Sequence, residues 1–203
     1  MSKNLLLVFT RNPELGKVKT RLAKTIGDQQ ALDIYKLLLH HTKKTIHNID
    51  CHKAVYYSET IQKNDIWDNS KFQKHIQNGM DLGDRMYNAF KDAFYKDYEK
   101  VVIVGTDIFE LQPKLINEAF KALDNHEAVI GPAKDGGYYL LGLKKLLPEI
   151  FKNKKWGEET VFKETMQDLN YVDVHLLDEL NDIDTYNDLK QHQELLKHIG
   201  PND

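Results

Sequence analysis

The stretch Val-Val-Ile-Val-Gly-Thr-Asp at residues 101–107 decides the fold. Its four consecutive β-branched residues show no polar alternation, which is the pattern of a strand buried on both faces. A strand of that kind lies in the middle of a parallel or mixed sheet with helices on either side. The sequence therefore predicts an α/β protein in which Asp107 stands just beyond the carboxyl end of a central strand.

Asp107 is the first candidate functional residue. In open α/β sheets, ligands bind in the crevice outside the carboxyl ends of the strands. A carboxylate at that place is suited to hold a divalent cation against phosphate oxygens, because hard cations prefer oxygen ligands. The alternative is structural: Asp107 supports a turn or caps the helix expected to begin near Pro113. The strand context leaves both interpretations open.

The composition is that of a soluble globular protein with one domain, residues 1–203. Hydrophobic residues make up 41% of the chain, and no apolar run approaches the ~20 residues needed to cross a bilayer. The net charge of −3 argues against nucleic acid as a partner. Cys51 is the only cysteine, which excludes an intrachain disulfide. We expect a cytoplasmic protein, and the sequence does not indicate its oligomeric state.

Apolar periodicity outlines the remaining elements. Strands are expected at 5–9, 54–57, near 75, 128–130, 138–143 and 172–177. Helices are expected from about 17 to 26, and then at 28–47, 82–98 and 113–124, after Trp156-Gly157 through about 169, and at 185–199. Residues 60–73 are interpreted as a loop with one short helical turn.

Basic residues gather between the first strand and the first helix. Five cations fall within 14 residues that contain a single acid, Glu14: Arg11, Lys17, Lys19, Arg21 and Lys24. Cations at the beginning of a helix oppose its macrodipole, so stability alone does not explain them. A loop leading from a strand into a helix also offers free N–H groups to an anion. We interpret this basic loop as a phosphate site, with a solvated basic surface as the alternative.

A further basic position lies in the stretch Gln-Asn-Gly-Met-Asp-Leu-Gly-Asp-Arg-Met, residues 77–86. Gly79 belongs to a turn ahead of the expected helix, and Arg85 lies in the first turn of that helix. Arg85 either reaches a ligand or pairs with Asp81 or Asp84, and the sequence favours neither.

The segment Asp135-Gly136-Gly137 is a turn by composition. Its glycines also allow a ligand to approach the backbone closely. Tyr138 and Tyr139 follow at the start of a strand, and a turn alone does not explain aromatic rings at the mouth of a sheet.

Asp182 and Asp184 form an Asp-Ile-Asp pattern ahead of the last expected helix. In an extended segment, two residues at this spacing point to the same side. The pair could complete a metal site with Asp107. The alternative is helix capping, with Asp184 or Thr185 as N-cap and Asp188 in the first turn.

Taken together, these stretches resemble a family of small bacterial proteins of the DUF2064 type, which have the GT-A fold and are usually described as glycosyltransferases. The resemblance covers almost the whole chain in order and is carried by residues 12–23, 77–86, 104–111, 131–143, Trp156 and 182–189. The fold is also similar to that of nucleotidyltransferases acting on molybdopterin, phospholactate and sugar phosphates. The family usually has proline two residues after the aspartate, whereas this chain has Phe109, so the loop beyond Asp107 can follow another path.

The resemblance implies a GT-A, nucleotide-diphospho-sugar transferase-like fold: a three-layer α/β/α sandwich with a mostly parallel mixed sheet. It implies a Mg²⁺ or Mn²⁺ ion near Asp107 and Asp184. Contacts with nucleotide or substrate are expected from Arg11, Lys17, Lys19, Arg21, Gly79, Arg85, Gly136, Gly137, Tyr138 and Trp156.

The leading functional hypothesis is a glycosyltransferase that moves a sugar from a nucleoside diphosphate to a small acceptor. The metal ion and the basic loop would stabilise charge on the leaving diphosphate, and Asp135 is a candidate base for an inverting mechanism. The alternatives are a nucleotidyltransferase using a nucleoside triphosphate and a non-catalytic nucleotide-binding protein. Because the loop lacks a glycine-rich cradle, we expect a nucleoside diphosphate or its sugar conjugate to bind better than a triphosphate.

Overall fold

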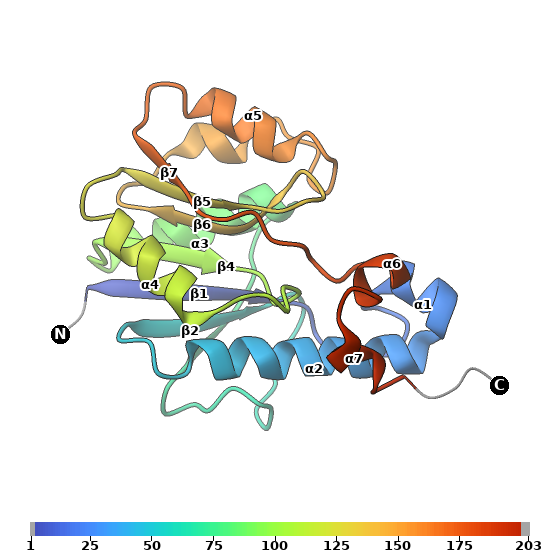
Figure 1. Ribbon diagram of the computed structural model, residues 1–203. Helices are drawn as coiled ribbons and strands as arrows, with labels where there is room; N and C mark the ends of the chain where they lie inside the picture. Colours follow the sequence, from blue (N-terminus) through green and yellow to red (C-terminus); the bar gives the residue numbers. More distant parts are fainter. Residues whose placement is uncertain (1–2, 200–203) are drawn as a thin grey trace.

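The structure, a computed structural model, describes residues 3–199. Within them lies one sheet with the strand order β3-β2-β1-β4-β6-β5-β7 (Figure 1). The strands are β1 (Asn4–Thr10), β2 (His52–Tyr57), β3 (Gln73–Ile76), β4 (Lys100–Val104), β5 (Ala128–Pro132), β6 (Tyr138–Leu143) and β7 (Val174–Leu176). Strand β6 is antiparallel to β4 and β5, and the other neighbouring pairs are parallel. The predicted mostly parallel mixed sheet is therefore confirmed.

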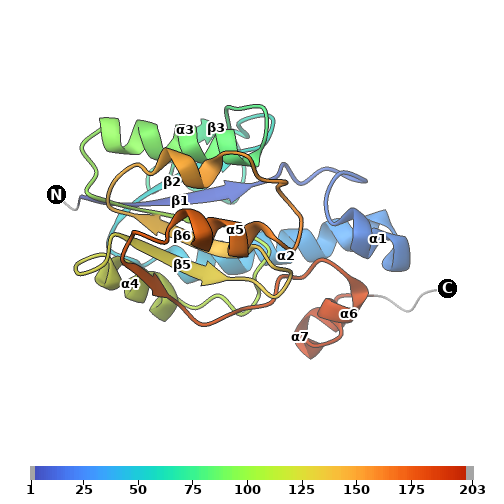
Figure 2. The ribbon, with the colours of Figure 1, turned by 90° about the horizontal axis from the view of Figure 1, so that it is seen from above.

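Helices cover both faces of this sheet and give the three predicted layers (Figures 1 and 2). Helices α2 (Asp28–Ile46) and α4 (Pro113–Ala122) pack on one face. The other face is covered by α3 (Leu82–Tyr95), the 3-10 helix η1 (Pro148–Phe151) and α5 (Val161–Asp168). None of the described helices is long and apolar enough to span a membrane.

Strand β4 is buried from both sides, as its sequence predicts. Val102 and Val104 pack into the core beneath α2 and α4, while Val101 and Ile103 pack into the core beneath α3. Burying an aliphatic side chain completely contributes roughly 1.5–3 kcal/mol, so β4 is held firmly in the middle of the molecule. The strand ends at Val104. Asp107 therefore follows just beyond the carboxyl edge of the sheet.

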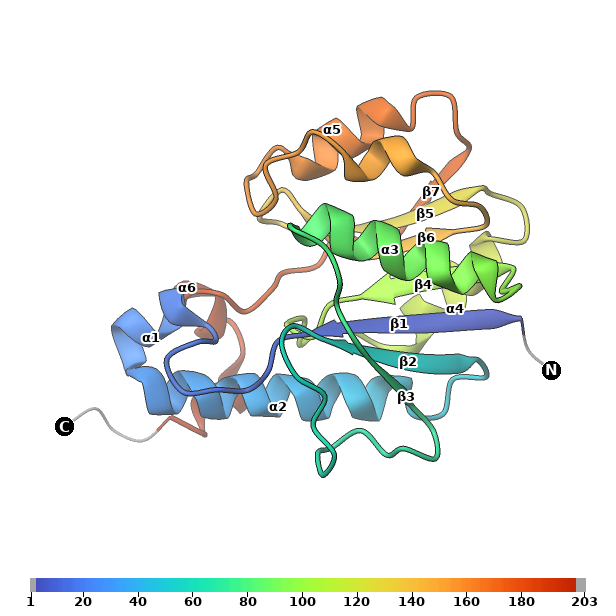
Figure 3. The same ribbon diagram turned by 180° about the vertical axis from the view of Figure 1, so that it is seen from behind.

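A smaller third cluster lies beyond the carboxyl ends of the strands. Helices α1 (Thr20–Ile26), α6 (Tyr186–Leu189) and α7 (Gln193–Leu196) gather there against the beginning of α2 (Figures 1 and 3). Leu22, Ile34 and Ile183 are fully buried within this cluster. It therefore brings residues 182–184, near the end of the chain, next to the helix that follows β1.

Two predicted helices differ from the structure. Helix α1 begins at Thr20, so Lys17 lies in the preceding loop and not on a helix. The single helix predicted at 185–199 is two short helices, because the backbone leaves helical geometry at His192 (φ −120°, ψ 87°). Leu189 and Leu195 both pack into the third cluster, whereas residues six positions apart lie on different sides of a continuous α-helix.

The long connection between β2 and β3 is a loop with one short helical turn, as expected at 60–73: the N–H groups of Lys71 and Phe72 donate to the Asp68 carbonyl at 3.0 Å and 2.9 Å. Trp67 and Phe72 anchor it, with both side chains 2% exposed and the rings edge to face at 5.2 Å. Two aromatic residues five positions apart give no helical period, which is why the sequence indicates no full helix in this connection.

Candidate functional site

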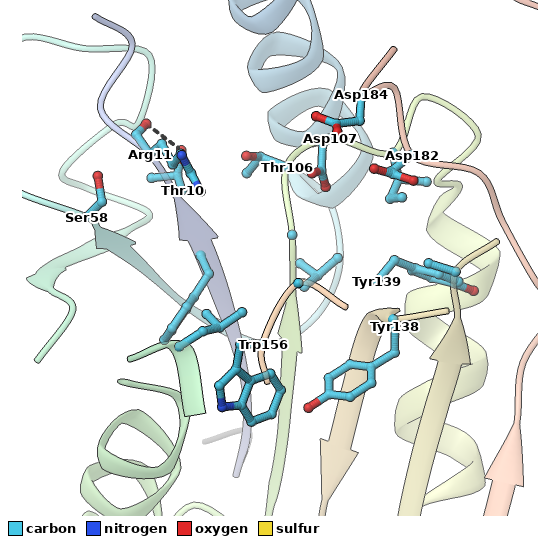
Figure 4. A pocket seen from close by; sticks show the side chains of 18 of the residues that line it. Thr10, Arg11, Ser58, Thr106, Asp107, Tyr138, Tyr139, Trp156, Asp182 and Asp184 are labelled. Atoms are coloured by element: carbon cyan, nitrogen blue, oxygen red, sulfur yellow. Dashed lines mark hydrogen bonds between the residues drawn. The ribbon is translucent and has the colours of Figure 1, made fainter. Parts of the chain in front are cut away.

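A cleft of about 820 Å³ opens at the carboxyl ends of β1 and β4 and the start of β6 (Figure 4). Strands β2 and β3 lie on one side of β1, and β4 lies on its other side. The cleft therefore lies at the point where the strand order reverses. One part, the charged end, contains Lys19, Asp107, Asp182 and Asp184. Another part, the apolar end, is lined by Leu82, Met86, Tyr138, Trp156 and Val161.

Lys19 occupies the centre of the charged end. Its ammonium nitrogen lies 3.2 Å from Asp107 Oδ2 and 3.9 Å from Asp184 Oδ1, and its side chain is 7% exposed. Burial would lower its pKa, but Asp107, Asp184 and Asp182 outweigh burial and raise it. Lys19 therefore stays charged. Its backbone is left-handed (φ 48°), a conformation that costs a non-glycine residue about 1–3 kcal/mol.

The other cations of the basic loop are more exposed. Lys17 pairs with Glu14 at 2.7 Å and Glu59 at 3.5 Å. Arg21 donates a hydrogen bond from Nη1 to Asp184 Oδ2 at 2.9 Å. Both side chains line the cleft, together with Arg11. The predicted gathering of cations is therefore present, but acidic side chains of the protein already engage Lys17, Lys19 and Arg21.

Asp107 lies where the sequence places it. Burial would raise its pKa, but the ammonium of Lys19 outweighs burial and holds the pKa below its usual range. Helix α4 has Gln112 as its N-cap, without a side-chain cap. The alternative role of Asp107, capping that helix, is therefore wrong, and its carboxylate faces Lys19 and the cleft.

The Asp-Ile-Asp segment is fixed beside Asp107 by its middle residue. The Ile183 N–H donates to the carbonyl of Asp107 at 3.0 Å, and the Ile183 side chain is fully buried. The flanking carboxylates of Asp182 and Asp184 both lie near Asp107 in the cleft (Figure 4). This arrangement is consistent with the prediction that both carboxylates point to the same side of the segment.

Helix capping does not use Asp184. Thr185 is the N-cap of α6 and forms a capping box with Asp188. Asp184 instead faces Arg21 and Lys19. Of the two capping residues that the sequence leaves open, the structure therefore selects Thr185.

Asp182 is the carboxylate with the least favourable surroundings. No hydrogen bond or ion pair engages its side chain within residues 3–199. Burial, together with the charges of Asp107 and Asp135, raises the pKa of Asp182 to about 6. A carboxylate held among other carboxylates indicates a place suited to an additional cation.

The turn at 135–137 forms as its composition predicts. The Gly137 N–H donates to Asp135 Oδ1 at 2.9 Å. Gly136 has φ 86°, and a Cβ there would lie under 3.0 Å from the backbone of Glu159. Gly136 is outside the cleft lining, whereas Asp135 and Gly137 belong to it. Close packing on Glu159 thus explains the glycine at position 136 better than contact with a ligand does.

The two tyrosines after this turn lie at the mouth of the sheet, as expected, but their hydroxyl groups are buried or bonded within the protein. The Tyr138 ring lies edge to face with Trp156 at 6.4 Å, and its hydroxyl is buried, which raises its pKa. The Tyr139 hydroxyl donates to the carbonyl of Asp178 at 3.0 Å. Both residues line the cleft as walls. Hydrophobic packing explains their presence better than contact of a hydroxyl with a ligand.

Gly79 and Arg85 lie close together, but only Arg85 lines the cleft. The Gly79 carbonyl accepts a hydrogen bond from Arg85 Nε at 3.3 Å. A Cβ on Gly79 would meet Asp84 Cβ at 2.6 Å, so the glycine is required by packing. The acids Asp81 and Asp84 cap backbone groups and do not pair with Arg85.

Sequence reasoning missed two residues of this region: Tyr35, which lines the cleft, and Asn12, which holds a neighbouring loop in place. The Tyr35 hydroxyl accepts from Arg11 N at 2.9 Å and lies 3.3 Å from Thr106 Oγ1, so it links the ends of β1 and β4. The Asn12 side chain donates to Thr60 O at 2.8 Å and thereby fixes the loop after β2. The only signal in the sequence was the position of Tyr35 on the buried stripe of α2, because a buried hydroxyl needs a hydrogen-bond partner.

The donor set fits a divalent cation. No three His, Cys, Asp or Glu side chains among residues 3–199 are arranged to hold a metal by themselves. Mg²⁺, however, usually takes one or two carboxylates and completes its shell with water and substrate phosphates. Asp182, which forms no ion pair within residues 3–199, and Asp107 at the edge of the cleft supply such a pair.

Comparison with known proteins agrees with this architecture. A 2-phospho-L-lactate guanylyltransferase from Methanocaldococcus fervens is 25% identical over 197 residues, which cover 92% of this chain and 88% of the relative. A crystal structure provisionally described as a nucleotide-diphospho-sugar transferase, from Desulfovibrio desulfuricans G20, is 28% identical and covers both chains completely with a TM-score of 0.87.

A more distant structure shows the same fold. The 4-diphosphocytidyl-2C-methyl-D-erythritol synthase from Anaerococcus prevotii has a TM-score of 0.61 at 12% identity, covering 97% of this chain and 96% of its own. The predicted nucleotide-diphospho-sugar transferase-like fold is thus confirmed. The family described as uncharacterized protein conserved in bacteria (DUF2064) matches residues 41–158. Because this match spans more than half of the chain, the protein belongs to the DUF2064 family.

Proposed function

We propose that the protein is a nucleotidyltransferase, which transfers the nucleotidyl group of a nucleoside triphosphate to a small acceptor and releases pyrophosphate. The observation that carries the proposal is the buried ammonium of Lys19, 3.2 Å from Asp107 in the cleft. During this reaction negative charge develops on the oxygens around the α-phosphorus. A cation fixed in advance at that point stabilises the transition state.

The relatives support this choice over sugar transfer. The guanylyltransferase relative aligns with 92% of this chain, and the charged end of the cleft falls within that range of similarity. Sugar transfer is the hypothesis that the sequence favours, but it needs cations mainly on the leaving diphosphate. Nucleotidyl transfer uses a buried cation directly at the reacting phosphorus, and Lys19 is suited to that role.

Each residue of the charged end then has a distinct part. Asp107 and Asp182 fit Mg²⁺ or Mn²⁺, and such an ion would supply Lewis-acid stabilisation of the phosphate oxygens. Asp184 holds Arg21 at 2.9 Å and lies 3.9 Å from Lys19, which orients both cations. We therefore prefer Asp182 over Asp184 as the second metal ligand, because both carboxylate oxygens of Asp184 face cations, whereas only Oδ2 of Asp107 does.

The acceptor oxygen forms a new bond to the α-phosphorus while the bond to the pyrophosphate oxygen breaks. An acceptor that attacks through an already ionised phosphate oxygen loses no proton and needs no base. This suits a cleft in which Asp135, the base expected from the sequence, is exposed and accepts a hydrogen bond from Gly137 N. A phosphorylated acceptor is therefore favoured over an alcohol.

Glycosyl transfer remains the second candidate. It is favoured by the full-length similarity to the protein provisionally described as a nucleotide-diphospho-sugar transferase. In that reaction Asp135, which lines the cleft, would take the proton of an acceptor hydroxyl. The metal ion and the basic loop would face the leaving nucleoside diphosphate.

Product analysis separates the two reactions. The protein is incubated with Mg²⁺ or Mn²⁺ and with either nucleoside triphosphates or nucleotide sugars, each combined with phosphorylated and hydroxylated acceptors. We expect pyrophosphate and a nucleotide-linked product from one triphosphate. Release of a nucleoside diphosphate from a nucleotide sugar would establish the second candidate instead.

Ligand binding gives an independent measure. A ligand at ~100 times its dissociation constant stabilises the fold by about 2.7 kcal/mol, which shifts the melting temperature measurably. Our proposal predicts that one nucleoside triphosphate gives the largest shift. The sequence predicts the opposite: because the basic loop lacks a glycine-rich cradle, a nucleoside diphosphate or its sugar conjugate should give a larger shift than a triphosphate. A larger shift with a nucleotide sugar would support the sequence-based expectation.

A further inference from the structure

The hydroxyl of Tyr35 lies where the chain after β1 meets the chain after β4. Tyr35 is on the buried side of α2 and is 3% exposed. Its hydroxyl accepts a hydrogen bond from Arg11 N at 2.9 Å and donates to Arg11 O at 3.1 Å. It also lies 3.1 Å from Thr10 Oγ1 and 3.3 Å from Thr106 Oγ1. Four polar atoms from two segments therefore surround one buried hydroxyl.

These groups satisfy one another in a consistent arrangement. A hydroxyl donates one hydrogen bond and accepts two. Thr10 Oγ1 donates to Arg11 O at 3.2 Å, so it does not need Tyr35 as an acceptor. The Tyr35 oxygen can then accept from the Arg11 N–H and from the Thr106 hydroxyl, which uses its full capacity. Removing the Tyr35 hydroxyl would take a partner from a buried group on each segment, which is costly.

This bridge lies beyond the part of the sheet that joins β1 to β4. The register between the two strands ends at Val8 and Val104. The next N–H group after β4, that of Gly105, donates to β6 at 3.1 Å. The Tyr35 hydroxyl therefore connects the two segments where the strand pairing has ended.

Each bridged position lies close to a residue of the proposed reaction. Arg11 begins the basic loop that carries Lys19, and Thr106 directly precedes Asp107 (Figure 4). Lys19 and Asp107 meet at 3.2 Å. The two segments are thus joined twice, by the Tyr35 hydroxyl at the ends of the strands and by the ion pair in the cleft. A shift at the first junction would change the distance between the ammonium and the carboxylate at the second.

We propose that Tyr35 is a positioning residue of the transfer reaction. Its hydroxyl fixes the basic loop relative to Asp107 and so sets where the ammonium of Lys19 meets the donor phosphates. Tyr35 acts through Lys19 and contacts no reacting atom. This inference rests on the proposed function, because it concerns how that same site is held in place.

A double-mutant cycle with Lys19 tests this coupling. Inorganic tripolyphosphate with Mg²⁺ is the probe, since it presents the phosphates of a donor without a nucleoside. Calorimetry should show that Tyr35→Phe binds it at least about fivefold more weakly than the wild type. In a Lys19→Met background the same substitution should change the affinity less than about twofold, because the contact that Tyr35 positions is already gone. Equal losses in both backgrounds, or no loss in either, would overturn the inference.

Thr106→Val interrupts the bridge at its other end and keeps the contacts of Tyr35 with Arg11. It should cause a smaller loss of tripolyphosphate affinity with the same dependence on Lys19. This variant decides the question if Tyr35→Phe does not fold, and an effect that does not depend on Lys19 would contradict the proposal.

Tyr57→Phe is the matched control for loss of a buried hydroxyl. The Tyr57 hydroxyl donates to Asp65, and Tyr57 is outside the cleft lining. This variant should lower the melting temperature and leave tripolyphosphate affinity unchanged. A loss as large as that of Tyr35→Phe would mean that reduced stability explains both, which would overturn the inference, as would absence of binding to the wild type. These titrations need no turnover, so their outcome is distinct from that of the test for nucleotidyl transfer.

Discussion

The charged end of the cleft and the apolar end hold their side chains in place by different means. At the charged end, segments far apart in the sequence meet through polar contacts, such as Lys19 with Asp107 and Ile183 N with the Asp107 carbonyl. At the apolar end, close packing against glycine fixes the geometry, with Gly83 against Trp156 and, just outside the cleft lining, Gly136 against Glu159, two residues before Val161. The two ends should therefore respond differently to substitution.

This difference separates chemistry from folding. Exchanging a carboxylate for its amide at the charged end keeps the shape and removes a charge, so activity should fall while the fold persists. Adding a methyl group to a packed glycine at the apolar end leaves every charge in place, so stability should fall first. Substitutions at the two ends therefore test this contrast.

Asp107→Asn should lower turnover at least about 100-fold, because exchanging even the outer partners of a metal ligand typically costs 10–100-fold. The amide has nearly the shape of the carboxylate, so circular dichroism should remain that of the wild type. Initial rates over a range of Mg²⁺ or Mn²⁺ concentrations measure the effect.

The matched control for that variant is Asp33→Asn, a half-exposed carboxylate on α2 outside the cleft. Its rates should equal those of the wild type. If Asp107→Asn kept wild-type rates at low metal concentration, Asp107 would have only a structural role.

Gly136→Ala should destabilise the fold by about 3 kcal/mol. The residue has φ 86°, and its Cβ would collide with the Glu159 backbone, so a strained conformation and overpacking both contribute. Gly157→Ala is the matched variant, because it has φ 92° but no atom within 4 Å of the new Cβ. Only the conformational cost of about 1 kcal/mol is expected there.

Urea unfolding of both glycine variants measures the difference. Equal losses would show that the close contact with Glu159 relaxes easily. The apolar end would then be less rigid than its packing indicates, and the contrast between the two ends would weaken.

Lys19→Met should weaken binding of a nucleoside triphosphate by about 2 kcal/mol, since charge-assisted hydrogen bonds are worth about 1.5–3 kcal/mol. Lys17→Met should have a smaller effect, because Lys17 is exposed and already pairs with Glu14 and Glu59. Calorimetry with the triphosphate and the matching nucleoside checks this, and the nucleoside should bind equally to all three proteins. Equal losses of triphosphate affinity would make Lys19 an ordinary surface cation in function.

The fold was largely predictable because its signals are local. The run Val101–Val104 alone indicates a central strand, and the apolar stripes of α2, α3 and α4 indicate the covering helices. The break at His192 was not predictable, because it depends on Leu189 and Leu195 packing into a cluster shared with α1. That contact is long-range, and no local pattern records it.

The candidate site was predictable by residue type but only partly by contact. The sequence indicates Asp107 and the basic loop, but it does not show that Lys19 alone is buried among carboxylates. It names Gly136 as a ligand contact, although packing on Glu159 explains that glycine. Tyr35 was recognisable only as a core residue, because its partners Arg11 and Thr106 follow two different strands.

The smallest predicted effect concerns pH and Asp182. Its pKa is raised in the folded protein from 3.8 to about 6 by burial and by neighbouring carboxylates. Between these values the folded state binds more protons than the unfolded state, so this group makes the free energy of unfolding fall as pH rises. Asp182→Asn removes that contribution. The variant should therefore gain stability over the wild type as pH rises from about 4 to about 7.

Urea unfolding without divalent ions, at about pH 4 and about pH 7, measures this gain as a difference between the two proteins. Taking the difference removes the pH dependence that Asp107 and other groups contribute to both. Asp33→Asn, on the surface of α2, should follow the wild type at both pH values. Added Mg²⁺ should then stabilise the wild type at about pH 7 more than it stabilises Asp182→Asn, because a bound cation offsets the repulsion that the substitution removes. A variant that is less stable than the wild type at about pH 7 would mean that Asp182 is held by favourable contacts, and the charged end would then lack the excess negative charge that makes it suited to a metal ion.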